Sequence, residues 1–285
     1  MKTIALVNPA SGGVTVDGAE RMREALEAAG LKSTEVVEID LDACENQMSL
    51  IADSDPDLFI VWGGDGTLRS ALSTVGKKTP NLVLLPGGTM NLLTKSLHGD
   101  KPWNTILNEV IAGPRQRKIT AGEINGEIFY CAMLAGAPAR FAEARESIRK
   151  GEIGKGVAAA RAALDTLQTI HLNARYGEGY SFTDDYLPTT SVIGALVGPL
   201  VKSGRMEIAA LAEPTTMSAL NVVWTSFLSD WRDAPGVTIV AADTLVIESE
   251  EGDDIPVIID GEPLEAGNRV SVKFVEEAGQ CLTAS

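Results

Sequence analysis

The sequence is poor in cysteine, histidine and aromatic residues, and each shortage excludes a class of protein. Its 285 residues include three cysteines and two histidines, and 5% of them are aromatic. The cysteines are odd in number and far apart, so they form neither a CxxC pair nor a disulfide framework; they are Cys44, Cys131 and Cys281. Neither His98 nor His171 has a metal-ligating neighbour in the sequence, which excludes the common zinc motifs. We therefore expect a reducing, cytoplasmic setting.

The sequence also lacks long apolar runs and an excess of positive charge. A membrane-spanning helix needs about 20 apolar residues and a signal peptide an apolar stretch of about 7–15. The N-terminal run Ile4–Val7 is shorter than either and predicts a first buried strand. Lysine and arginine number 24 against 39 acidic residues, for a formal net charge of −15. This excludes nucleic acid as the main partner, because nucleic acid requires a basic surface.

Several familiar catalytic motifs are absent. No GxGxxG follows the first strand, and no GxxxxGK[ST] occurs, which excludes the Rossmann and Walker A phosphate loops. The hydrolase turn GxSxG and the zinc protease motif HExxH are also missing. A phosphate-binding site in this chain therefore has to be built from another pattern.

The first 113 residues alternate between strand and helix patterns. Short apolar runs predict strands at residues 3–9, 34–39, 57–62 and 81–85. Helical periodicity lies between and after them, at residues 17–29, 41–52, 66–75 and 103–111. This alternation predicts a parallel sheet with helices on both faces. Ligands on such sheets bind at the carboxyl ends of the strands.

After Pro114 the pattern changes to short β-rich runs. Asn125-Gly126 predicts a tight hairpin, and a helical segment is expected at residues 139–169. The sequence thus predicts an α/β nucleotide-binding domain with a mostly parallel sheet at residues 1–115 and an antiparallel β-sandwich domain at residues 116–268. A last strand near residues 270–285 is expected to return to the first domain.

Three glycine-rich loops follow predicted strands of the first domain. They are NPASGG at residues 8–13, GGDGT at residues 63–67 and PGGTMN at residues 86–91. Glycine lets the backbone approach a ligand closely, and the N–H groups at a helix start attract phosphate. One such loop alone is explained equally well by a plain turn. Three loops at one sheet edge predict a nucleotide site, with Ser11 and Asn91 as polar contacts.

Asp65 is unexpected in a loop that binds phosphate, because a carboxylate repels phosphate. It is explained if Mg²⁺ bridges the two groups, or if Asp65 accepts a hydrogen bond from a substrate hydroxyl. The alternative is that Asp65 caps the helix that follows. A cap needs one acidic residue and not three glycines, so we predict that Asp65 acts on a metal or a hydroxyl.

Together, NPASGG, WGGDGTLRSAL, LPGGTMNLL and IDGEP resemble, in this order, the diacylglycerol kinase catalytic superfamily, which includes bacterial lipid kinases, sphingosine kinases and ceramide kinases. The resemblance implies transfer of the γ-phosphate of ATP, with Mg²⁺, to a lipid alcohol such as diacylglycerol. It implies Asp260 or Glu262 as the general base, assisted by Asp65. The residues expected to bind the nucleotide are Asn8, Ser11, Gly12, Gly63, Gly64, Asp65, Gly66, Thr67, Gly88, Thr89 and Asn91.

One segment departs from the family pattern. Members of the family commonly carry an acidic segment that helps to hold a structural Mg²⁺. The matching stretch here is Lys202–Glu207, in which Ser203 replaces the expected Asp and Arg205 adds a positive charge. We therefore predict that this structural metal site is absent or altered.

Two further groups of residues have alternative interpretations. A basic cluster either forms a solvated helix face or contacts lipid head groups at the inner membrane face; it consists of Arg140, Arg145, Arg149 and Lys150. An apolar set at helical spacing either packs in the core or lines a lipid pocket; it consists of Trp224, Phe227, Leu228 and Trp231.

The alternative functions are an NAD kinase-like enzyme, which shares GGDGT, and a non-catalytic nucleotide- or lipid-binding protein. The order of PGGTMN and the late DGEP favours the lipid kinase over the NAD kinase. Neither the identity of the lipid nor the oligomeric state, for which a homodimer is one option, follows from the sequence.

Overall fold

The computed structural model of the chain describes residues 1–31, 33–136, 139, 170–179, 181–190, 192–201, 203–211 and 237–284. The chain divides into unit 1, Met1–Ala121 with Glu276–Ser285, and unit 2, Gly122–Val275. The sequence places the borders near residues 115 and 268. The helical segment expected at residues 139–169, apart from Ala139, lies outside the described residues, as do the basic cluster and the apolar set around Trp224.

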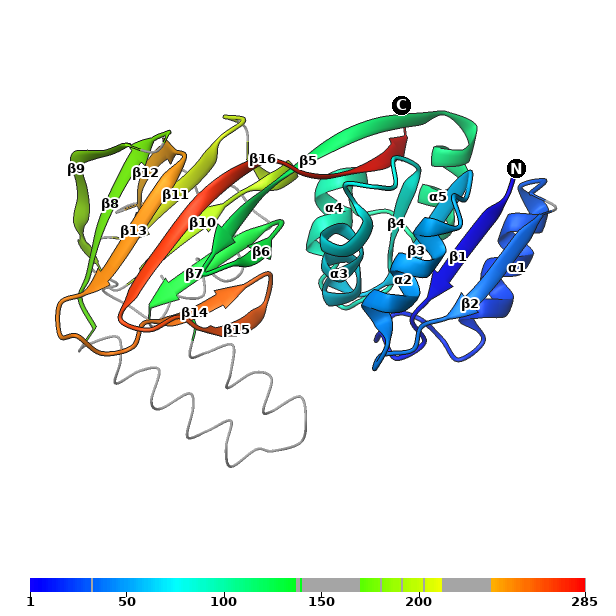
Figure 1. Ribbon diagram of the computed structural model, residues 1–285, viewed down its shortest axis with the longest axis horizontal. Coiled ribbons are helices and arrows are strands. Elements are labelled where there is room, and N and C mark those ends of the chain that lie inside the picture. Colours follow the sequence, from blue (N-terminus) through cyan, green and yellow to red (C-terminus); the bar gives the residue numbers. More distant parts are fainter. Residues whose placement is uncertain are drawn as a thin grey trace. The chain divides into compact units, whose positions relative to one another are not determined.

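Unit 1 contains a parallel sheet, as the sequence predicts (Figure 1). The strands β1 (Thr3–Val7), β2 (Thr34–Glu38), β3 (Leu58–Gly63) and β4 (Leu82–Pro86) lie in the order β2-β1-β3-β4, and each pairing is parallel. Every residue of β1 and β3 is buried. Helices on both faces of a parallel sheet require such continuous apolar strands.

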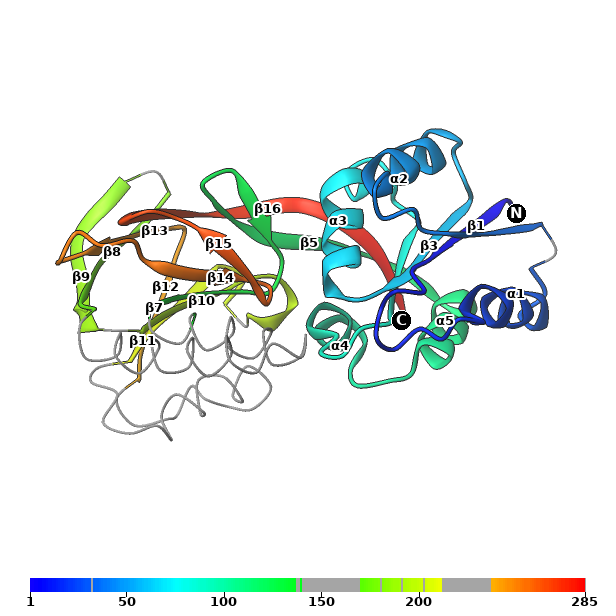
Figure 2. The ribbon, with the colours of Figure 1, turned by 90° about the horizontal axis from the view of Figure 1, so that it is seen from below.

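Five helices follow or precede these strands. They are α1 (Gly18–Ala28), α2 (Cys44–Asp53), α3 (Asp65–Val75), α4 (Leu92–His98) and α5 (Trp103–Ala112). Helices α2 and α3 lie on one face of the sheet, and α1 and α5 lie on the other (Figure 2). Met22 and Leu26, one helical turn apart on α1, are fully buried in a core cluster that includes Trp62. Burying one such side chain contributes about 1.5–3 kcal/mol to stability.

Trp62 fixes the end of β3 against its neighbours. Its ring lies 4.2 Å, centroid to centroid, from the ring of Trp103. Its Nε1 donates a hydrogen bond of 2.9 Å to the backbone oxygen of Pro86, the last residue of β4. The carboxyl ends of β3 and β4, where two of the glycine loops begin, are therefore held together by a buried side chain.

Unit 2 is a β-sandwich, which confirms the predicted fold class. One sheet has the order β12-β11-β10-β7-β14-β15 and the other β6-β5-β16-β13-β8-β9. Both sheets contribute buried residues to a single core, Met133, Ile193 and Ile208 from the first and Leu172, Leu245 and Val272 from the second.

The strands of these two sheets are β5 (Pro114–Ile124), β6 (Glu127–Phe129), β7 (Ala132–Gly136), β8 (Leu172–Glu178), β9 (Ser181–Thr190), β10 (Val192–Leu196), β11 (Met206–Leu211), β12 (Val237–Ala242), β13 (Thr244–Ser249), β14 (Pro256–Ile259), β15 (Glu262–Glu265) and β16 (Arg269–Ala284). A short 3-10 helix covers Gly198–Leu200. Strands β5 and β16 each have residues in both units.

Two hairpins of unit 2 have the same two-residue loop. Asn125-Gly126 joins β5 to β6, with φ angles of 51° and 89°. Asp260-Gly261 joins β14 to β15, with φ angles of 49° and 93°. Positive φ at both positions is typical of the type I′ turn, which suits Asn, Asp and Gly. The hairpin predicted at Asn125-Gly126 is confirmed.

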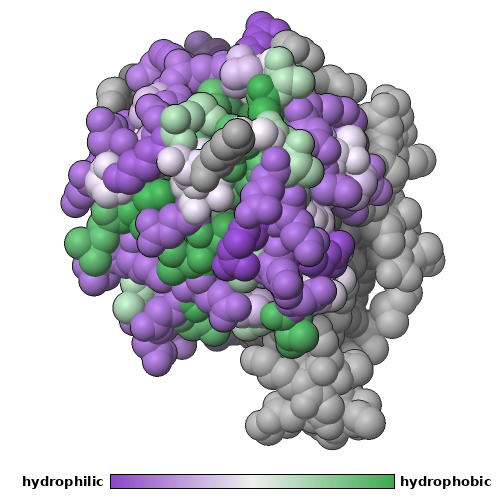
Figure 3. Space-filling view, turned by 90° about the vertical axis from the view of Figure 1, so that its right-hand side faces the viewer, coloured by the Kyte–Doolittle hydropathy of each residue, from purple (hydrophilic) through white to green (hydrophobic). Residues whose placement is uncertain are grey.

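The surface of unit 1 is mostly hydrophilic on the face drawn in Figure 3, and hydrophobic residues form separate areas on it. Within the described ranges, no helix has the length and apolar character that crossing a membrane demands.

Candidate active site

The three glycine loops meet at the carboxyl edge of the parallel sheet. We call them loop 1 (residues 8–13, after β1), loop 2 (residues 63–67, after β3) and loop 3 (residues 86–91, after β4). The Gly13 N–H donates to the Gly87 oxygen at 2.8 Å, and the Gly87 N–H donates to the Gly63 oxygen at 2.7 Å. Backbone hydrogen bonds thus join all three loops. Gly13 and Gly87 lie in the predicted loops but are not among the residues predicted to bind the nucleotide.

Loops 2 and 3 touch through glycines that have no room for a side chain. A Cβ atom on Gly88 would lie 2.8 Å from the Cα atom of Gly64, and one on Gly87 would lie 3.0 Å from the Cα atom of Gly63. Close backbone approach of this kind is available only to glycine. The glycines therefore bring the loops together, in addition to leaving room for a ligand.

Hydrogen bonds of the polar side chains of Ser11 and Asn8 connect loop 1 to loop 2. The Ser11 Oγ accepts the Gly64 N–H at 2.9 Å. The buried Asn8 donates from Nδ2 to the Thr67 Oγ1 at 2.8 Å and accepts the Ala10 N–H at 3.0 Å. These predicted nucleotide contacts are therefore brought together, and their side chains also position the loop backbone.

Asn91 organises loop 3 in the same way. Its φ of 54° is left-handed, a conformation that Asn tolerates better than most residues. Its side-chain Oδ1 accepts the Gly88 N–H at 2.7 Å, and its Nδ2 donates to the Gly88 oxygen at 2.9 Å. Thr89 lies beside loop 1, since its Oγ1 would be 3.4 Å from a Cβ atom on Gly12.

Asp65 is the first residue of α3, but its carboxylate interacts with α4. The residue before α3 is Gly64, and no side chain caps this helix. The Asp65 Oδ1 accepts the Leu93 N–H at 3.3 Å, in the first turn of α4. Burial raises the pKa of Asp65 above its ordinary value, and the backbone N–H groups of residues 91–93 oppose this rise. Asp65 thus connects loop 2 to the helix after loop 3.

The start of α3 has the chemistry to hold phosphate. The first hydrogen bond within the helix is donated by Leu68 to the Gly64 oxygen, at 3.0 Å. The N–H groups of Asp65, Gly66 and Thr67 therefore have no acceptor inside the helix, and such a helix end attracts anions. Asp65 is the only acidic residue of loops 1–3. This set fits Mg²⁺, which is commonly bound by one or two carboxylates together with phosphate oxygens and water.

Asp260, in unit 2, is held by a ring of backbone donors. Its Oδ2 accepts the Tyr130 N–H at 2.7 Å, and its Oδ1 accepts the N–H groups of Cys131 and Ala132 at 2.9 and 3.0 Å. Its own N–H donates to the Ala132 oxygen at 2.8 Å. The carboxylate thus fixes the segment 130–132. Glu262, at the start of β15, is exposed.

Ser203 and Arg205 form a compact turn in unit 2. The Ser203 Oγ donates to the Arg205 oxygen at 3.0 Å and accepts the Arg205 N–H at 3.3 Å. The Arg205 guanidinium donates to Asp243 at 2.9 Å and to Glu178 at 2.8 Å, and it lowers the pKa of Asp243. The Arg205 guanidinium thus provides a positive charge beside the carboxylates of Asp243 and Glu178, and the loss or alteration of a structural metal site there stays a prediction.

Replacing Arg205 by methionine is expected to lower the free energy of unfolding by about 1 kcal/mol, because the ion pairs are partly exposed. MgCl₂ is expected to leave the stability of the natural protein unchanged and to raise that of Arg205→Met. Urea denaturation with and without MgCl₂, at constant ionic strength, measures both effects. Equal stabilisation of both proteins by MgCl₂ would show that a cation already binds beside Arg205.

The two histidines differ in their surroundings. His171 has no metal-ligating neighbour in the sequence, but the fold places two acidic side chains, those of Glu250 and Glu251, next to it. Its Nδ1 lies 2.5 Å from the Glu251 Oε1, and Glu250 is close enough that the three ligand atoms lie within 4.8 Å of one another. His98, the last residue of α4, is buried, and its Nε2 has no partner among the described residues. Burial, assisted by nearby Lys101 and Arg117, lowers the pKa of His98 to about 4.

The buried His98 is expected to destabilise the protein in mild acid. Its unfolded-state pKa of 6.5 lies above the folded-state value of about 4, so the unfolded chain binds the proton first. Stability is then complete above pH 6.5 and falls as the pH decreases toward 4, by about 2–3 kcal/mol at pH 4.5.

Denaturation of the natural protein and of His98→Gln at pH 7.5 and pH 4.5 measures this effect. The exposed His171, whose pKa is raised by Glu251, contributes with the opposite sign in both proteins and cancels in the comparison. An equal loss of stability in both proteins would contradict the assignment to His98.

The candidate residues of unit 1 lie close together in the structure. The other two candidates, Asp260 and Glu262, belong to unit 2. Loops 1, 2 and 3 form one connected cluster that contains all predicted nucleotide-binding residues. Asp260 and Glu262 lie two positions apart, on either side of Gly261, at the β14–β15 hairpin. The cluster and the hairpin belong to different units.

Solved structures share the fold of this chain. A crystal structure of a diacylglycerol kinase from Bacillus anthracis has a TM-score of 0.67 and 15% identity to this chain, over 99% of this chain and 96% of the other. A candidate diacylglycerol kinase from the same organism has a TM-score of 0.69 and 16% identity, over 99% and 97%. At these identities the similarity shows that the fold is shared.

Matches found by sequence comparison cover less than half of the chain. A candidate lipid kinase of Streptococcus pneumoniae is 30% identical over 132 residues, which are 45% of this chain and 44% of the relative. The chain thus matches less than half the length of this curated relative. The sequence model of the diacylglycerol kinase catalytic domain matches residues 2–124. The match covers the residues that hold loops 1–3, so this part of the chain is similar in sequence to the diacylglycerol kinase catalytic domain.

Proposed function

We propose that this protein is a lipid kinase that transfers the γ-phosphate of ATP to the hydroxyl group of a lipid. The observation that carries the proposal is the joining of loops 1, 2 and 3 at the carboxyl edge of the parallel sheet, beside the N–H groups at the start of α3 that have no acceptor inside the helix. The match of residues 2–124 to the diacylglycerol kinase catalytic domain, and the similarity to the candidate S. pneumoniae lipid kinase, support a lipid acceptor. Because such a lipid resides in a bilayer, the proposal includes peripheral contact at the inner membrane face.

Each group of residues has a role in this reaction. Loops 1–3 bind and orient the phosphates through backbone N–H groups, which lowers the barrier mainly by positioning and charge stabilisation. Bound Mg²⁺, held by Asp65, would neutralise phosphate charge. Glu262 accepts the proton of the lipid hydroxyl as that oxygen attacks the γ-phosphorus and ADP leaves. We assign this proton to Glu262 because the Asp260 oxygens already accept three backbone N–H groups.

The test uses ATP labelled at the γ-phosphate and a panel of lipid alcohols in mixed micelles, including diacylglycerol and a sphingoid base. Label is expected in one lipid class. Asp65→Asn is expected to lose activity while retaining the fold, since the amide keeps an oxygen that can accept the Leu93 N–H.

Other results would overturn the proposal. Labelled NAD phosphate in place of labelled lipid would indicate an NAD kinase. Binding of ATP without transfer to any lipid would indicate a non-catalytic binding protein. Full activity of Asp65→Asn would exclude the role given to Asp65.

A further inference from the structure

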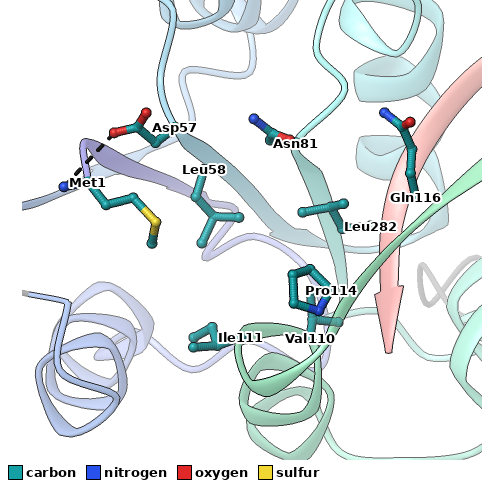
Figure 4. A pocket seen from close by; sticks show the side chains of 9 residues that line it. All are labelled: Met1, Asp57, Leu58, Asn81, Val110, Ile111, Pro114, Gln116 and Leu282. Atoms are coloured by element: carbon teal, nitrogen blue, oxygen red, sulfur yellow. Dashed lines mark ion pairs between the residues drawn. The ribbon is translucent and has the colours of Figure 1, made fainter. Parts of the chain in front are cut away.

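A pocket of about 390 Å³ lies within unit 1 at the end of the parallel sheet opposite to loops 1–3 (Figure 4). Met1 precedes β1, Leu58 begins β3 and Asn81 precedes β4, so the pocket opens at the amino ends of these strands. Its lining consists of Met1, Asp57, Leu58, Asn81, Val110, Ile111, Pro114, Gln116 and Leu282. It shares no residue with the candidate active site.

One side of the pocket is apolar. Leu58, Val110 and Leu282 form its floor and belong to the core cluster of unit 1, with 6%, 1% and 8% of their surfaces exposed. Ile111 and Pro114 extend this side (Figure 4). Volume and lining fit the small-molecule sites of proteins, which are mostly apolar and measure about 300–1,000 Å³.

The other side carries three polar side chains, Asp57, Asn81 and Gln116 (Figure 4). The Asp57 carboxylate accepts the Lys2 N–H at 2.6 Å and lies 3.9 Å from the N-terminal ammonium of Met1. Its charge is therefore already matched. The side-chain amides of Asn81 and Gln116 have no hydrogen-bond partner in the described part of the chain. Primary amides donate and accept hydrogen bonds without charge.

We propose that this pocket binds a small neutral amphiphile. Its hydrocarbon body would pack on Leu58, Val110 and Leu282, and its hydroxyl or amide group would bond to Asn81 and Gln116. A charged head group of either sign gains little, because the Asp57 carboxylate and the N-terminal ammonium already pair with each other and a charged group loses hydration when it enters the pocket.

The test uses 1-octanol as the probe, with octanoate and octylammonium as charged controls of equal chain length. Backbone amide NMR shifts are recorded on the full chain during each titration. Saturable shifts are expected at residues that line the pocket, among them Leu58 and Gln116, with none at residues 64–67 and 88–91. Because 1-octanol has about nine heavy atoms, we expect its Kd for the pocket to be on the order of 1 mM.

Variants locate the binding site. Asn81→Ala and Gln116→Ala are each expected to weaken 1-octanol binding about fivefold, the effect of one net hydrogen bond. The backbone oxygen of residue 81 still accepts the Phe59 N–H after the Asn81 substitution, because only the side chain changes. Ile111→Phe is expected to fill the pocket and abolish the shifts. Leu50→Phe is the matched control, because Leu50 is 63% exposed and does not line the pocket.

Three results would overturn the proposal. Octanoate binding as tightly as 1-octanol would exclude selection for a neutral head group. Shifts that spread over unit 2 would indicate nonspecific partition into the protein. Undiminished binding by Ile111→Phe, with its fold intact by amide spectrum, would place the ligand elsewhere.

Discussion

Asp260→Ala is expected to lower the free energy of unfolding by about 3–5 kcal/mol, because it removes the carboxylate that accepts three buried backbone N–H groups. These groups belong to Tyr130, Cys131 and Ala132, which are 1%, 2% and 8% exposed. Glu262→Gln is expected to leave stability nearly unchanged, since Glu262 is exposed. It is expected to lower kcat by about 10²–10⁴-fold, the usual contribution of a general base.

Two measurements on each variant separate the roles of these carboxylates. Urea denaturation gives stability, and turnover is expressed per folded molecule. Asp260→Asn keeps one acceptor oxygen, so its loss of stability is expected to lie between those of the natural protein and Asp260→Ala. If Asp260→Asn were fully stable and inactive while Glu262→Gln kept its kcat, the base would be Asp260.

Gly88→Ala is expected to cost about 3 kcal/mol of stability, because a backbone clash has to be relieved by moving a loop. The added Cβ atom would lie 2.8 Å from the Gly64 Cα and 3.2 Å from the Asn91 Oδ1. Separating loops 2 and 3 is expected to weaken ATP binding more than tenfold, since N–H groups on both loops would contact the phosphates.

Gly194→Ala, in β10, is the control for this prediction because Gly194 lies outside loops 1–3. Its Cβ atom would meet only the Met133 backbone oxygen at 3.8 Å and the Leu134 Cδ1 at 3.9 Å, which are ordinary contacts. Denaturation and calorimetric titration with Mg-ATP compare both variants with the natural protein. Equal effects of the two substitutions would show that close packing of loops 2 and 3 is not what the site requires.

Several elements of unit 1 are predictable because their signals are local. The strands β1 and β3 are continuous apolar runs, as expected for strands buried on both faces. Helix α3 buries Leu68, Ala71, Leu72 and Val75, which are spaced three or four residues apart. The predicted and observed limits of β3 and β4 differ by one residue at each end.

Other elements depend on distant partners. Strand β8 (Leu172–Glu178) has the sequence LNARYGE, which carries little apolar signal, and it forms by pairing with β13, about 70 residues away. Strand β16 runs from Arg269 to Ala284, close to the last strand expected near residues 270–285, and its last residues are buried in unit 1. No local pattern encodes such pairings, because the stabilising contacts arise only after folding.

The sequence alone determined where the candidate site lies, because glycine pairs after buried strands are a local signal and parallel strands end at one edge. Only the tertiary structure decided what its side chains do. Ser11, Asn91 and Asp260 hold backbone groups, and Asp65 reaches the start of α4. Apart from the Asn91 bonds to Gly88, three positions away, these bonds join residues far apart in the chain, as does the pocket between Leu58 and Leu282. The geometry that makes them exists only in the folded state.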